Sequence, residues 1–506
     1  MEHEAFVPPP QQENRISTGN AGLDDILGGG IDADRMYLYE GRPGTGKTTL
    51  ALEFLLEGVR NGEKTLYISL SETQRELELV ATRHGWDVSD VAIFELIPPE
   101  TTLDPSQELT VLHPAEVELG ETTQLILERV ASLSPTRVVI DSLSELRLLA
   151  QSSLRYRRQV LALKHFFASR ACTVVLLDDM TSHENDLQLH SICHGVVLLE
   201  QLAIEYGAER RRLRVVKMRG IQFRGGYHDL TIKRGGLEIY PRLVAAEHHK
   251  SFIGDFVSSG NAALDKLLGG GLERGTNALL IGAAGVGKSS LAITYALAAA
   301  QRGQKTAFFA FDEGRGTIEA RARTLGLQLE PALDAGLVIF QQIDPAELSP
   351  GEFAKIVRDR VQQDQVSFVI IDSLNGYLNA MPDGRFLILQ MHELLTFLGQ
   401  QGVLTLLVMA QHGLMGPMET PLDISYLSDA VLMLRYFEYG GTVRRALSVV
   451  KKRSGDHEHT IREFKLSRNG LSLGPPLKEF SGVLSGTPIY VGSAEPLLED
   501  GSEQER

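Results

Sequence analysis

Gly41-Arg42-Pro43-Gly44-Thr45-Gly46-Lys47-Thr48 fits the pattern G-x-x-x-x-G-K-[ST], and Gly282-Ala283-Ala284-Gly285-Val286-Gly287-Lys288-Ser289 fits it again. Each copy follows a short apolar run and opens a helical pattern, which is the context that a phosphate-binding loop needs. The glycines let backbone N–H groups curl around a phosphate without a Cβ in the way, and the helix N-terminus adds the positive end of a dipole. A glycine-rich turn that binds nothing would explain one copy, but two complete copies in the same context argue against it.

The residue types in the two loops indicate how each would hold a nucleotide. Lys47 and Lys288 are placed to reach the β- and γ-phosphates, and the hydroxyls of Thr48 and Ser289 to ligate Mg²⁺. We therefore expect ATP and Mg²⁺ as cofactors. The residues expected to bind the nucleotide are Gly41, Gly44, Thr45, Gly46, Lys47, Thr48 and Thr49 in the first loop, and Gly282, Gly285, Val286, Gly287, Lys288, Ser289 and Ser290 in the second.

The two loops belong to a long internal repeat. The stretch Ser17 to Asp24, followed by three glycines, returns at Ser258 to Asp265, again followed by three glycines. An offset of 241 residues separates these stretches and also separates Lys47 from Lys288. A period this long indicates a duplicated domain rather than a solenoid. We predict a flexible N-terminal tail at 1–15, one nucleotide-binding domain at 16–246, a second at 247–484, and an acidic, disordered C-terminal tail at 485–506.

Short apolar runs alternate with helical patterns in both halves. In the first half we predict a helix after the loop and buried strands at 36–39, 65–70, 137–140 and 173–177. This alternation is typical of an α/β domain with a mostly parallel sheet and helices on both faces.

The composition disfavours several kinds of partner. The chain has 506 residues and a net charge of −15, whereas a protein that works on duplex nucleic acid usually carries a basic footprint. Anionic membrane surfaces are disfavoured for the same reason, and no apolar run reaches the ~18 residues of a membrane span. Residues 1–15 show no signal-peptide core. The two cysteines, Cys172 and Cys193, are too few for a disulfide framework, which favours a reducing compartment. We expect a cytoplasmic protein.

Acidic residues end two matching apolar runs. Asp141 follows the run 137–140, and Asp372 follows the run 368–371. A carboxylate at such a strand end can hold Mg²⁺ beside the hydroxyl of the phosphate-binding loop. The alternative is an aspartate that caps the next helix. The expected metal ligands are therefore Thr48 and Asp141 in the first half, and Ser289 and Asp372 in the second.

A second acid follows the strand that comes after the helix of each loop. It is Glu72 in the first half, and in the second half Glu313 is preceded by another acid, Asp312. A carboxylate at this place can orient or deprotonate a water that attacks the γ-phosphate. The alternative is a solvated residue at the start of a helix. We expect Glu72, Asp312 and Glu313 to be the catalytic residues.

This order of motifs resembles that of RecA-like ATPases. The preamble S-x-G-x-x-x-L-D-x-x-L-G-G-G, present twice, resembles the KaiC family in particular, and the resemblance extends from Ile16 to Gly486. It implies two tandem RecA-like domains and a homo-oligomer, a hexameric double ring with ATP at the subunit interfaces. It also implies that Lys217 and Arg219, and in the second ring Lys451 and Arg453, reach the phosphates of a neighbouring subunit. The alternative is that these basic residues only line a strand.

The sequence departs from the pattern of the family at two places. The family has paired glutamates where this chain has Ser71-Glu72 and Asp312-Glu313, so hydrolysis in the first half must depend on Glu72 or be weak. KaiC proteins also phosphorylate themselves in the second domain on two adjacent hydroxyl residues. These fall on Ser425 and Tyr426, with tyrosine where threonine is usual. An ordinary loop serine is the alternative to an acceptor at Ser425.

Three functions remain open from the sequence. The first is an ATPase and serine autokinase that acts in signalling or timing through contacts with partner signalling proteins. The second is a DNA-dependent RecA-like ATPase of recombination or repair, which the net charge opposes. The third is a ring scaffold that ATP holds together with little turnover. The most basic run, 209–214, could contact nucleic acid, but so short a run is more often a solvated hairpin or a subunit interface.

Overall fold

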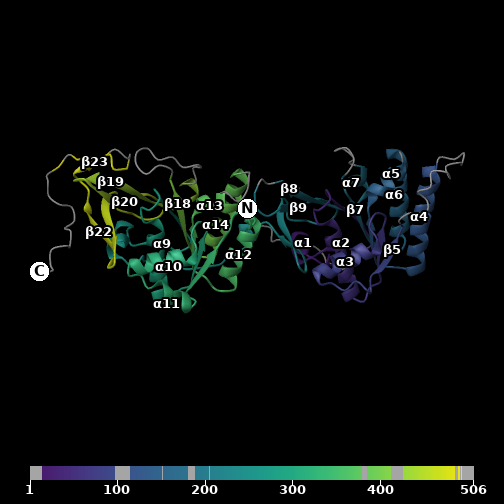
Figure 1. The fold of residues 1–506 in the computed structure, drawn as a ribbon, viewed down its shortest axis with the longest axis horizontal. Coiled ribbons are helices and arrows are strands. Elements are labelled where there is room, and N and C mark those ends of the chain that lie inside the picture. Colours follow the sequence, from purple (N-terminus) through teal and green to yellow (C-terminus); the bar gives the residue numbers. More distant parts are fainter. Residues whose placement is uncertain are drawn as a thin grey trace, which may run out of the picture. The chain divides into compact units, whose positions relative to one another are not determined.

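The computed structural model describes residues 14–96, 114–150, 152–180, 188–203, 206–378, 384–411, 425–484, 488–490 and 492. Most of both predicted tails lies outside these residues, although Ile489–Tyr490 of the predicted C-terminal tail forms a short strand paired with Phe480–Ser481. The chain divides into two compact units (Figure 1). Unit 1 comprises Met1–Glu205 and Glu209–Arg242, and unit 2 comprises Tyr206–Ala208 and Leu243–Arg506.

Unit 1 is built on a sheet that has nine strands among its described residues, in the order β11-β10-β9-β8-β3-β7-β6-β4-β5. The six strands from β8 to β5 run parallel, and β9, β10 and β11 extend the sheet antiparallel. The bounds are β3 Met36–Glu40, β4 Thr65–Ser69, β5 Ala92–Glu95, β6 Arg137–Asp141, β7 Thr173–Asp178, β8 Gly195–Leu202, β9 Arg210–Met218, β10 His228–Lys233 and β11 Gly236–Tyr240; a separate pair joins β1 Arg15–Ile16 to β2 Ile31–Asp32.

Helices cover both faces of this sheet. Odd-numbered residues of β3, such as Tyr37 and Tyr39, belong to one buried cluster with α1 Ala21–Ile26, α2 Lys47–Arg60 and α3 Gln74–His84. Even-numbered residues, such as Met36 and Leu38, belong to a second cluster. Its helices are α4 Pro114–Leu133, α5 Leu143–Ala150, α6 Ser153–Ala168 and α7 Gln188–Ile192. This alternation follows from the two-residue period of a strand.

Unit 2 repeats the topology, with the strand order β16-β15-β17-β18-β14-β19-β20-β21-β22. The strands are β14 Asn277–Gly282, β15 Thr306–Ala310, β16 Val338–Gln342, β17 Phe368–Asp372, β18 Leu404–Ala410, β19 Ala430–Tyr439, β20 Thr442–Lys452, β21 Ile461–Ser467 and β22 Gly470–Pro476. The helices are α8 Ala262–Leu267, α9 Lys288–Gln301, α10 Arg315–Thr324, α11 Leu329–Asp334, α12 Pro350–Gln362, α13 Leu374–Leu378 and α14 Gly384–Gln400. Short elements complete the unit: η3 Ala245–Glu247, β12 Phe256–Val257, β13 Leu272–Glu273, η4 Ser425–Leu427, β23 Phe480–Ser481 and β24 Ile489–Tyr490.

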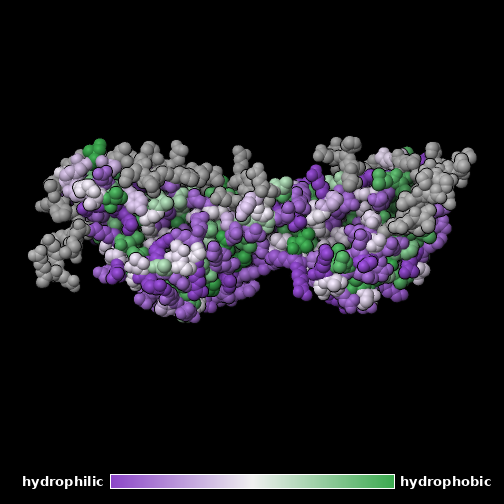
Figure 2. Space-filling model, in the orientation of Figure 1, coloured by the Kyte–Doolittle hydropathy of each residue, from purple (hydrophilic) through white to green (hydrophobic). Residues whose placement is uncertain are grey.

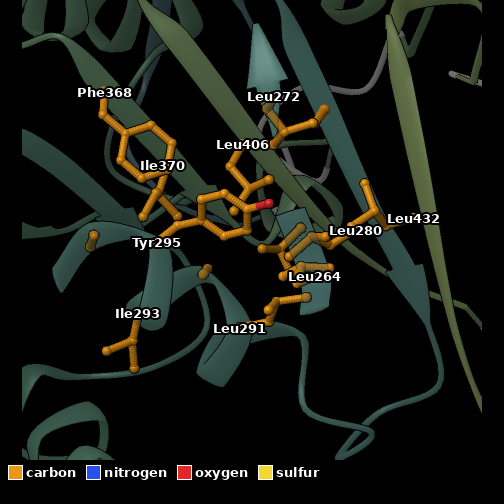
Figure 3. Packing of buried hydrophobic residues seen from close by; sticks show 14 of the residues in the cluster. Leu264, Leu272, Leu280, Leu291, Ile293, Tyr295, Phe368, Ile370, Leu406 and Leu432 are labelled. Atoms are coloured by element: carbon orange, nitrogen blue, oxygen red, sulfur yellow. The ribbon is translucent and has the colours of Figure 1, made fainter. Parts of the chain in front are cut away.

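The predicted fold class is therefore confirmed: both units are α/β, with a mostly parallel sheet between helices. The core of unit 2 is drawn in Figure 3, where Tyr295 of α9 points toward the strands that carry Phe368, Ile370 and Leu406. The rings of Tyr295 and Phe368 are 6.3 Å apart.

The repeated preamble has a structural role that its sequence did not reveal. The carboxylate of Asp24 accepts hydrogen bonds from the hydroxyls of Ser17 and Thr18, both at 2.7 Å. The side chain of Asn20 caps α1 by accepting from the first backbone N–H groups of that helix, and its Nδ2 donates to Glu53 of α2 at 2.9 Å. The preamble thus fixes α1 against the helix that follows the phosphate-binding loop. Asp265 and Asn261 make the corresponding bonds to the preamble and α8 in unit 2.

Hydrophilic residues dominate the surface of both units that faces the viewer in Figure 2, with hydrophobic residues in small groups. Within the described residues, every helix is too short or too polar to cross a membrane.

Candidate nucleotide-binding sites

The backbone of both loops leaves a helix N-terminus open. Gly46 and Gly287 precede α2 and α9 with φ of 103° and 114°, a left-handed conformation that favours glycine. Neither helix has a side chain that caps its first N–H groups. Those donors and the helix dipole are therefore free to bind an anion such as a phosphate.

The two loop lysines are buried and differ in their partners. Lys47 donates to the carbonyl oxygens of Gly41 at 2.7 Å and Arg42 at 3.2 Å, and its Nζ lies 2.9 Å from Oδ1 of Asp179. Lys288 donates to the carbonyl oxygens at the start of its own loop. Burial lowers the pKa of Lys288 to about 8, although the charge of Asp372 opposes this shift.

The structure brings the expected metal ligands together in each unit. Oδ2 of Asp141 accepts from the hydroxyl of Thr48 at 3.3 Å and from that of Tyr67 at 2.5 Å. Burial raises the pKa of Asp141, and these two hydroxyls oppose the rise. Burial likewise raises the pKa of Asp372 to about 6, with the Ser289 hydroxyl opposing it. Paired hydroxyl and carboxylate oxygens suit a hard cation such as Mg²⁺.

The candidate catalytic glutamates each keep one carboxylate oxygen buried and without a hydrogen-bond partner among the described residues. The turn that carries Glu72 is held by Ser69, whose hydroxyl accepts from the backbone N–H of Glu72 at 3.0 Å. Burial raises the pKa of Glu72, and the charge of Asp141 adds to the effect. The other oxygen of Glu313 accepts from Arg321 of α10. A carboxylate oxygen that is buried without a hydrogen bond costs free energy. A water or a substrate hydroxyl would supply the missing hydrogen bond.

Replacement of the acid at position 71 changes the surroundings of the metal ligand in unit 1. In unit 2, Asp312 accepts a hydrogen bond from Ser373, the residue after Asp372. In unit 1 the equivalent serine, Ser142, is fully buried, and its hydroxyl has no partner in the described part of the chain. Ser71, which stands where Asp312 stands, is exposed. The two sites therefore differ by one carboxylate at this place.

The four expected trans-acting cations lie at the edge of each sheet opposite to the phosphate-binding loop. The loop of unit 1 begins beside Leu199 of β8, whereas the backbone N–H of Arg219 donates to the carbonyl of His194, just before β8. Leu199 and His194, the residue just before β8, are five residues apart. At about 3.3 Å a residue, the start of the loop and the backbone of Arg219 are therefore separated by roughly 16 Å along the sheet. Arg453 donates in the same way to Asp429, five residues before Leu434, which is opposite Gly282.

A β-bulge precedes each pair of cations. Lys217 is opposite Val196, but the next partner of β8 is Val215, so Val216 is the extra residue. Lys451 is opposite Val431 and is preceded by the extra residue Val450. The bulge leaves Val216 and Val450 exposed at 36% and 50%. Bulges commonly redirect the side chains next to them, and Lys217 here donates to the carbonyl of Cys193 at 2.8 Å.

The expected phosphoacceptors lie in η4, beside the cations of unit 2. The guanidinium of Arg453 donates to the carbonyl of Tyr426 at 2.8 Å, and the Tyr426 side chain is 55% exposed. The side chain of Ser425 lies outside the described residues. The register of β8 and β19 places His190 and Ser191 at the equivalent positions of unit 1, where Arg219 donates to the carbonyl of Ser191, also at 2.8 Å.

A pocket of about 430 Å³ marks the site of unit 2. Its lining includes the loop residues Gly285, Gly287, Lys288, Ser289 and Ser290, and also Glu313, Arg321, Thr324, Leu325, Arg445 and Leu466. The sequence reasoning missed the residues that arrive from distant strands. Arg445 is on β20, and its counterpart Arg211 on β9 donates to the carbonyl of Gly44 at 2.9 Å. The basic run 209–214 therefore contributes to β9 and to the loop. Asp179 was missed because the second half has Ala410 at the equivalent place, so the internal repeat did not single this acid out.

Two further features bear on the predicted chemistry. Cys172 and Cys193 are both free and buried. Among the described residues, histidine, cysteine and acidic side chains form no cluster of three or more that could hold a metal ion.

Comparison with known proteins agrees with this geometry. The sequence model of the KaiC ATPase family matches residues 16–244 and 257–478. The chain is 25% identical over 494 residues to the circadian clock protein KaiC3 of Synechocystis sp., covering 95% of this chain and 96% of that protein. It is 27% identical over 492 residues to the circadian clock oscillator protein KaiC of Acaryochloris marina, covering 95% and 92%. The chain therefore belongs to the KaiC family of P-loop ATPases and carries two tandem domains of that family.

Proposed function

We propose that both units bind Mg-ATP and hydrolyse it, and that the chain works as a head-to-tail homo-oligomer. The observation that carries this proposal is the repeated set of groups around each loop: an open helix N-terminus, a buried lysine, a hydroxyl beside an aspartate, and a glutamate with one unpartnered oxygen. The aspartate beside the loop hydroxyl and the unpartnered glutamate oxygen support hydrolysis over nucleotide storage, because they can hold Mg²⁺ and position a water.

The side chains have separate tasks in this proposal. Lys47 and Lys288 leave the carbonyl oxygens of their loops to bind the β- and γ-phosphates, while Thr48 with Asp141, and Ser289 with Asp372, hold Mg²⁺. Bound Mg²⁺ supplies charge neutralisation between the phosphate oxygens. Glu72 and Glu313 orient and deprotonate the attacking water, a task for which an unpartnered oxygen is suited.

Head-to-tail assembly follows from the placement of the cations. Arg219 and Arg453 lie about 16 Å along the sheet from the level of their own loops, too far to contact the same nucleotide. A neighbour that presents its cation edge to this loop edge would complete the site and stabilise charge on the γ-phosphate. Such an interface joins two different surfaces, and it closes into a ring when the rotation permits. A hexameric double ring is the form that we propose.

We further propose that unit 2 phosphorylates itself on Ser425. Because η4 is held by Arg453 at the cation edge, the ATP that phosphorylates it would belong to the neighbouring subunit. Asp312 and Glu313 of that neighbour offer two carboxylates for the hydroxyl proton. Unit 1 has a histidine, His190, at the place of Ser425, so the acceptor that we propose has no hydroxyl counterpart there, and we propose phosphorylation in unit 2. Tyr426 is the second candidate, since its side chain is exposed.

The biological setting is part of the proposal. The relatives are named as circadian clock proteins, so we propose a role in signalling or timing through partner signalling proteins. Two free, buried cysteines support action in the reducing cytoplasm. A scaffold with little turnover remains the second candidate for unit 1, because Ser71 replaces an acid there. A DNA-dependent motor is opposed by the net charge of −15 and would show an ATPase rate that rises with single-stranded DNA.

Three measurements test the proposal. Lys47→Ala and Lys288→Ala should each remove one bound nucleotide per chain, counted by chromatography after denaturation. Light scattering should show a larger particle with Mg-ATP than without it. Phosphopeptide mapping after incubation with labelled ATP should find phosphate on Ser425 and none in Ser425→Ala. A monomer under both conditions, or a lysine variant that keeps both nucleotides, would contradict the corresponding claim.

A further inference from the structure

Asp179 is an acid that only unit 1 brings to its phosphate-binding loop. It follows β7, and its Oδ1 lies 2.9 Å from Nζ of Lys47, the atom expected to bind the β- and γ-phosphates. Phosphates bound to Lys47 would take the place of Asp179 at the Nζ atom, so the Asp179 carboxylate would lie close to them. Its backbone is held by the hydroxyl of Ser144, which accepts from the Asp179 N–H at 3.3 Å, so the position is built into the strand end.

The same carboxylate interacts with the other acids of the site through its charge. Burial is the main cause that raises the pKa of Glu72 and of Asp141, and the negative charge of Asp179 adds to both shifts, so the three carboxylates are close enough to interact electrostatically. Lys47 is the cation among them. One oxygen of Glu72 has no partner among the described residues, so the cluster has an open acceptor that neither Lys47 nor Asp179 satisfies.

Strand register shows what unit 2 has at this place. In unit 1, Glu40 of β3 is opposite Asp178. The residue of unit 2 that corresponds to Glu40 is Ile281 of β14, 241 positions later, and it is opposite Met409. The residue after each partner is Asp179 in unit 1 and Ala410 in unit 2. Unit 2, in turn, has Asp312 where unit 1 has Ser71. Each site thus contains three carboxylates, but one of the three comes from a different strand.

We infer that Asp179 is a catalytic residue of the first ATP site and takes the part of the acid that is missing at Ser71. The inference rests on the proposed hydrolysis of ATP by unit 1. The water oxygen bonds to the γ-phosphorus while the bond from that phosphorus to the bridging oxygen breaks, and ADP leaves with the electron pair. Asp179, with Glu72, orients the water and accepts its proton, which then passes to the products.

The test uses the full chain with Lys288→Ala, so that turnover reports the first site. Asp179→Asn should lower kcat by about 10-fold or more, a modest part of the ~10²–10⁴-fold value of general-base assistance, because Glu72 remains. ATP affinity, measured with a non-hydrolysable analogue, should be equal or tighter, since Lys47 loses a competing carboxylate. Adding Ser71→Asp should restore turnover, because it returns an acid to the place that Asp312 has in unit 2.

A matched control is Asp25→Asn, which removes an acid paired with Arg224 elsewhere in unit 1 and should change neither value. An unchanged or raised kcat in Asp179→Asn would overturn the inference, because Asp179 would then only compete for Lys47. Loss of ATP affinity together with kcat would also overturn it, because the carboxylate would then shape the loop. The Lys288→Ala chain without further substitutions tests the proposed function. If it binds ATP but shows no turnover, hydrolysis at the first site is itself contradicted.

Discussion

The second ATP site should lose affinity as the pH rises above about 8. Lys288 is 7% exposed and has a pKa of about 8 in the ligand-free site, against 10.5 for a free lysine. Binding of the phosphates requires the charged ammonium, so above pH 8 a proton must be taken up before ATP can bind. Each further pH unit then weakens binding by about tenfold, or about 1.4 kcal/mol. At pH 9 we expect affinity about tenfold below its value at pH 7.

The measurement is isothermal titration calorimetry with a non-hydrolysable ATP analogue and saturating Mg²⁺, from pH 7 to 9.5, on the Lys47→Ala chain. Ala410→Asp tests the cause, because it places a carboxylate where Asp179 lies in unit 1. An opposite charge within a few ångströms favours the charged lysine and shifts its pKa by about 1–3 units. The alkaline fall should therefore move upward by about one unit or more, while Ala410→Asn should leave it in place.

A flat affinity between pH 7 and 9.5 would refute the reasoning, because burial would then not discharge Lys288. An alkaline fall that stays in place after Ala410→Asp would refute the electrostatic part alone. Proton uptake gives an independent check: the heat of binding above pH 8 should depend on the ionisation enthalpy of the buffer, and below pH 7 this dependence on Lys288 should vanish.

Three further outcomes follow from contacts in the structure. Because Asp372 has a pKa of about 6 and must be ionised to hold Mg²⁺, the Mg²⁺ concentration needed for binding at the second site should rise about fivefold from pH 6 to 5, measured by titration with Mg²⁺. Arg137→Ala should destabilise unit 1 by about 2–4 kcal/mol, because it removes a buried guanidinium that pairs with the partly exposed Glu63 and donates to the carbonyl oxygens of Ser17 and Phe54; calorimetry should show a lower unfolding temperature for one transition only. Tyr67→Phe should move the acid limit of Mg²⁺ binding at the first site to higher pH, because Asp141 loses a hydrogen bond that lowers its pKa.

The fold could be predicted because each element follows from a pattern of residues that are close together in the sequence. The two loops, the apolar runs and the 241-residue repeat are short-range features, and the predicted strands at 36–39 and 137–140 correspond to β3 and β6 with one residue added to each. The pairing of Thr48 with Asp141 could also be anticipated, because parallel strands end at the same edge of a sheet. The function of these residues stays a prediction.

Contacts that depend on register could not be predicted in this way. Asp179 and Arg211 reach the first loop only because β7 and β9 pair with their neighbours as they do. A one-residue change of register would turn either side chain to the other face. The bulges before Lys217 and Lys451 likewise have no sequence signal. The unpartnered hydroxyl of Ser142 shows the reverse case: the serine at position 71 was visible in the sequence, but its effect at the end of the neighbouring strand was not.

The duplication of one sheet topology on a single chain has a consequence for the cell. Two separate proteins would reach a ratio set by the expression and lifetime of each, and that ratio would drift with growth conditions. Here the two sheets are translated together and degraded together, so they are always present in equal number. The ratio of the two sites is therefore protected from fluctuations in the amount of protein. Substitutions such as those at positions 71, 179 and 410 can alter one site without the other, which makes this part of their balance an inherited property of the gene.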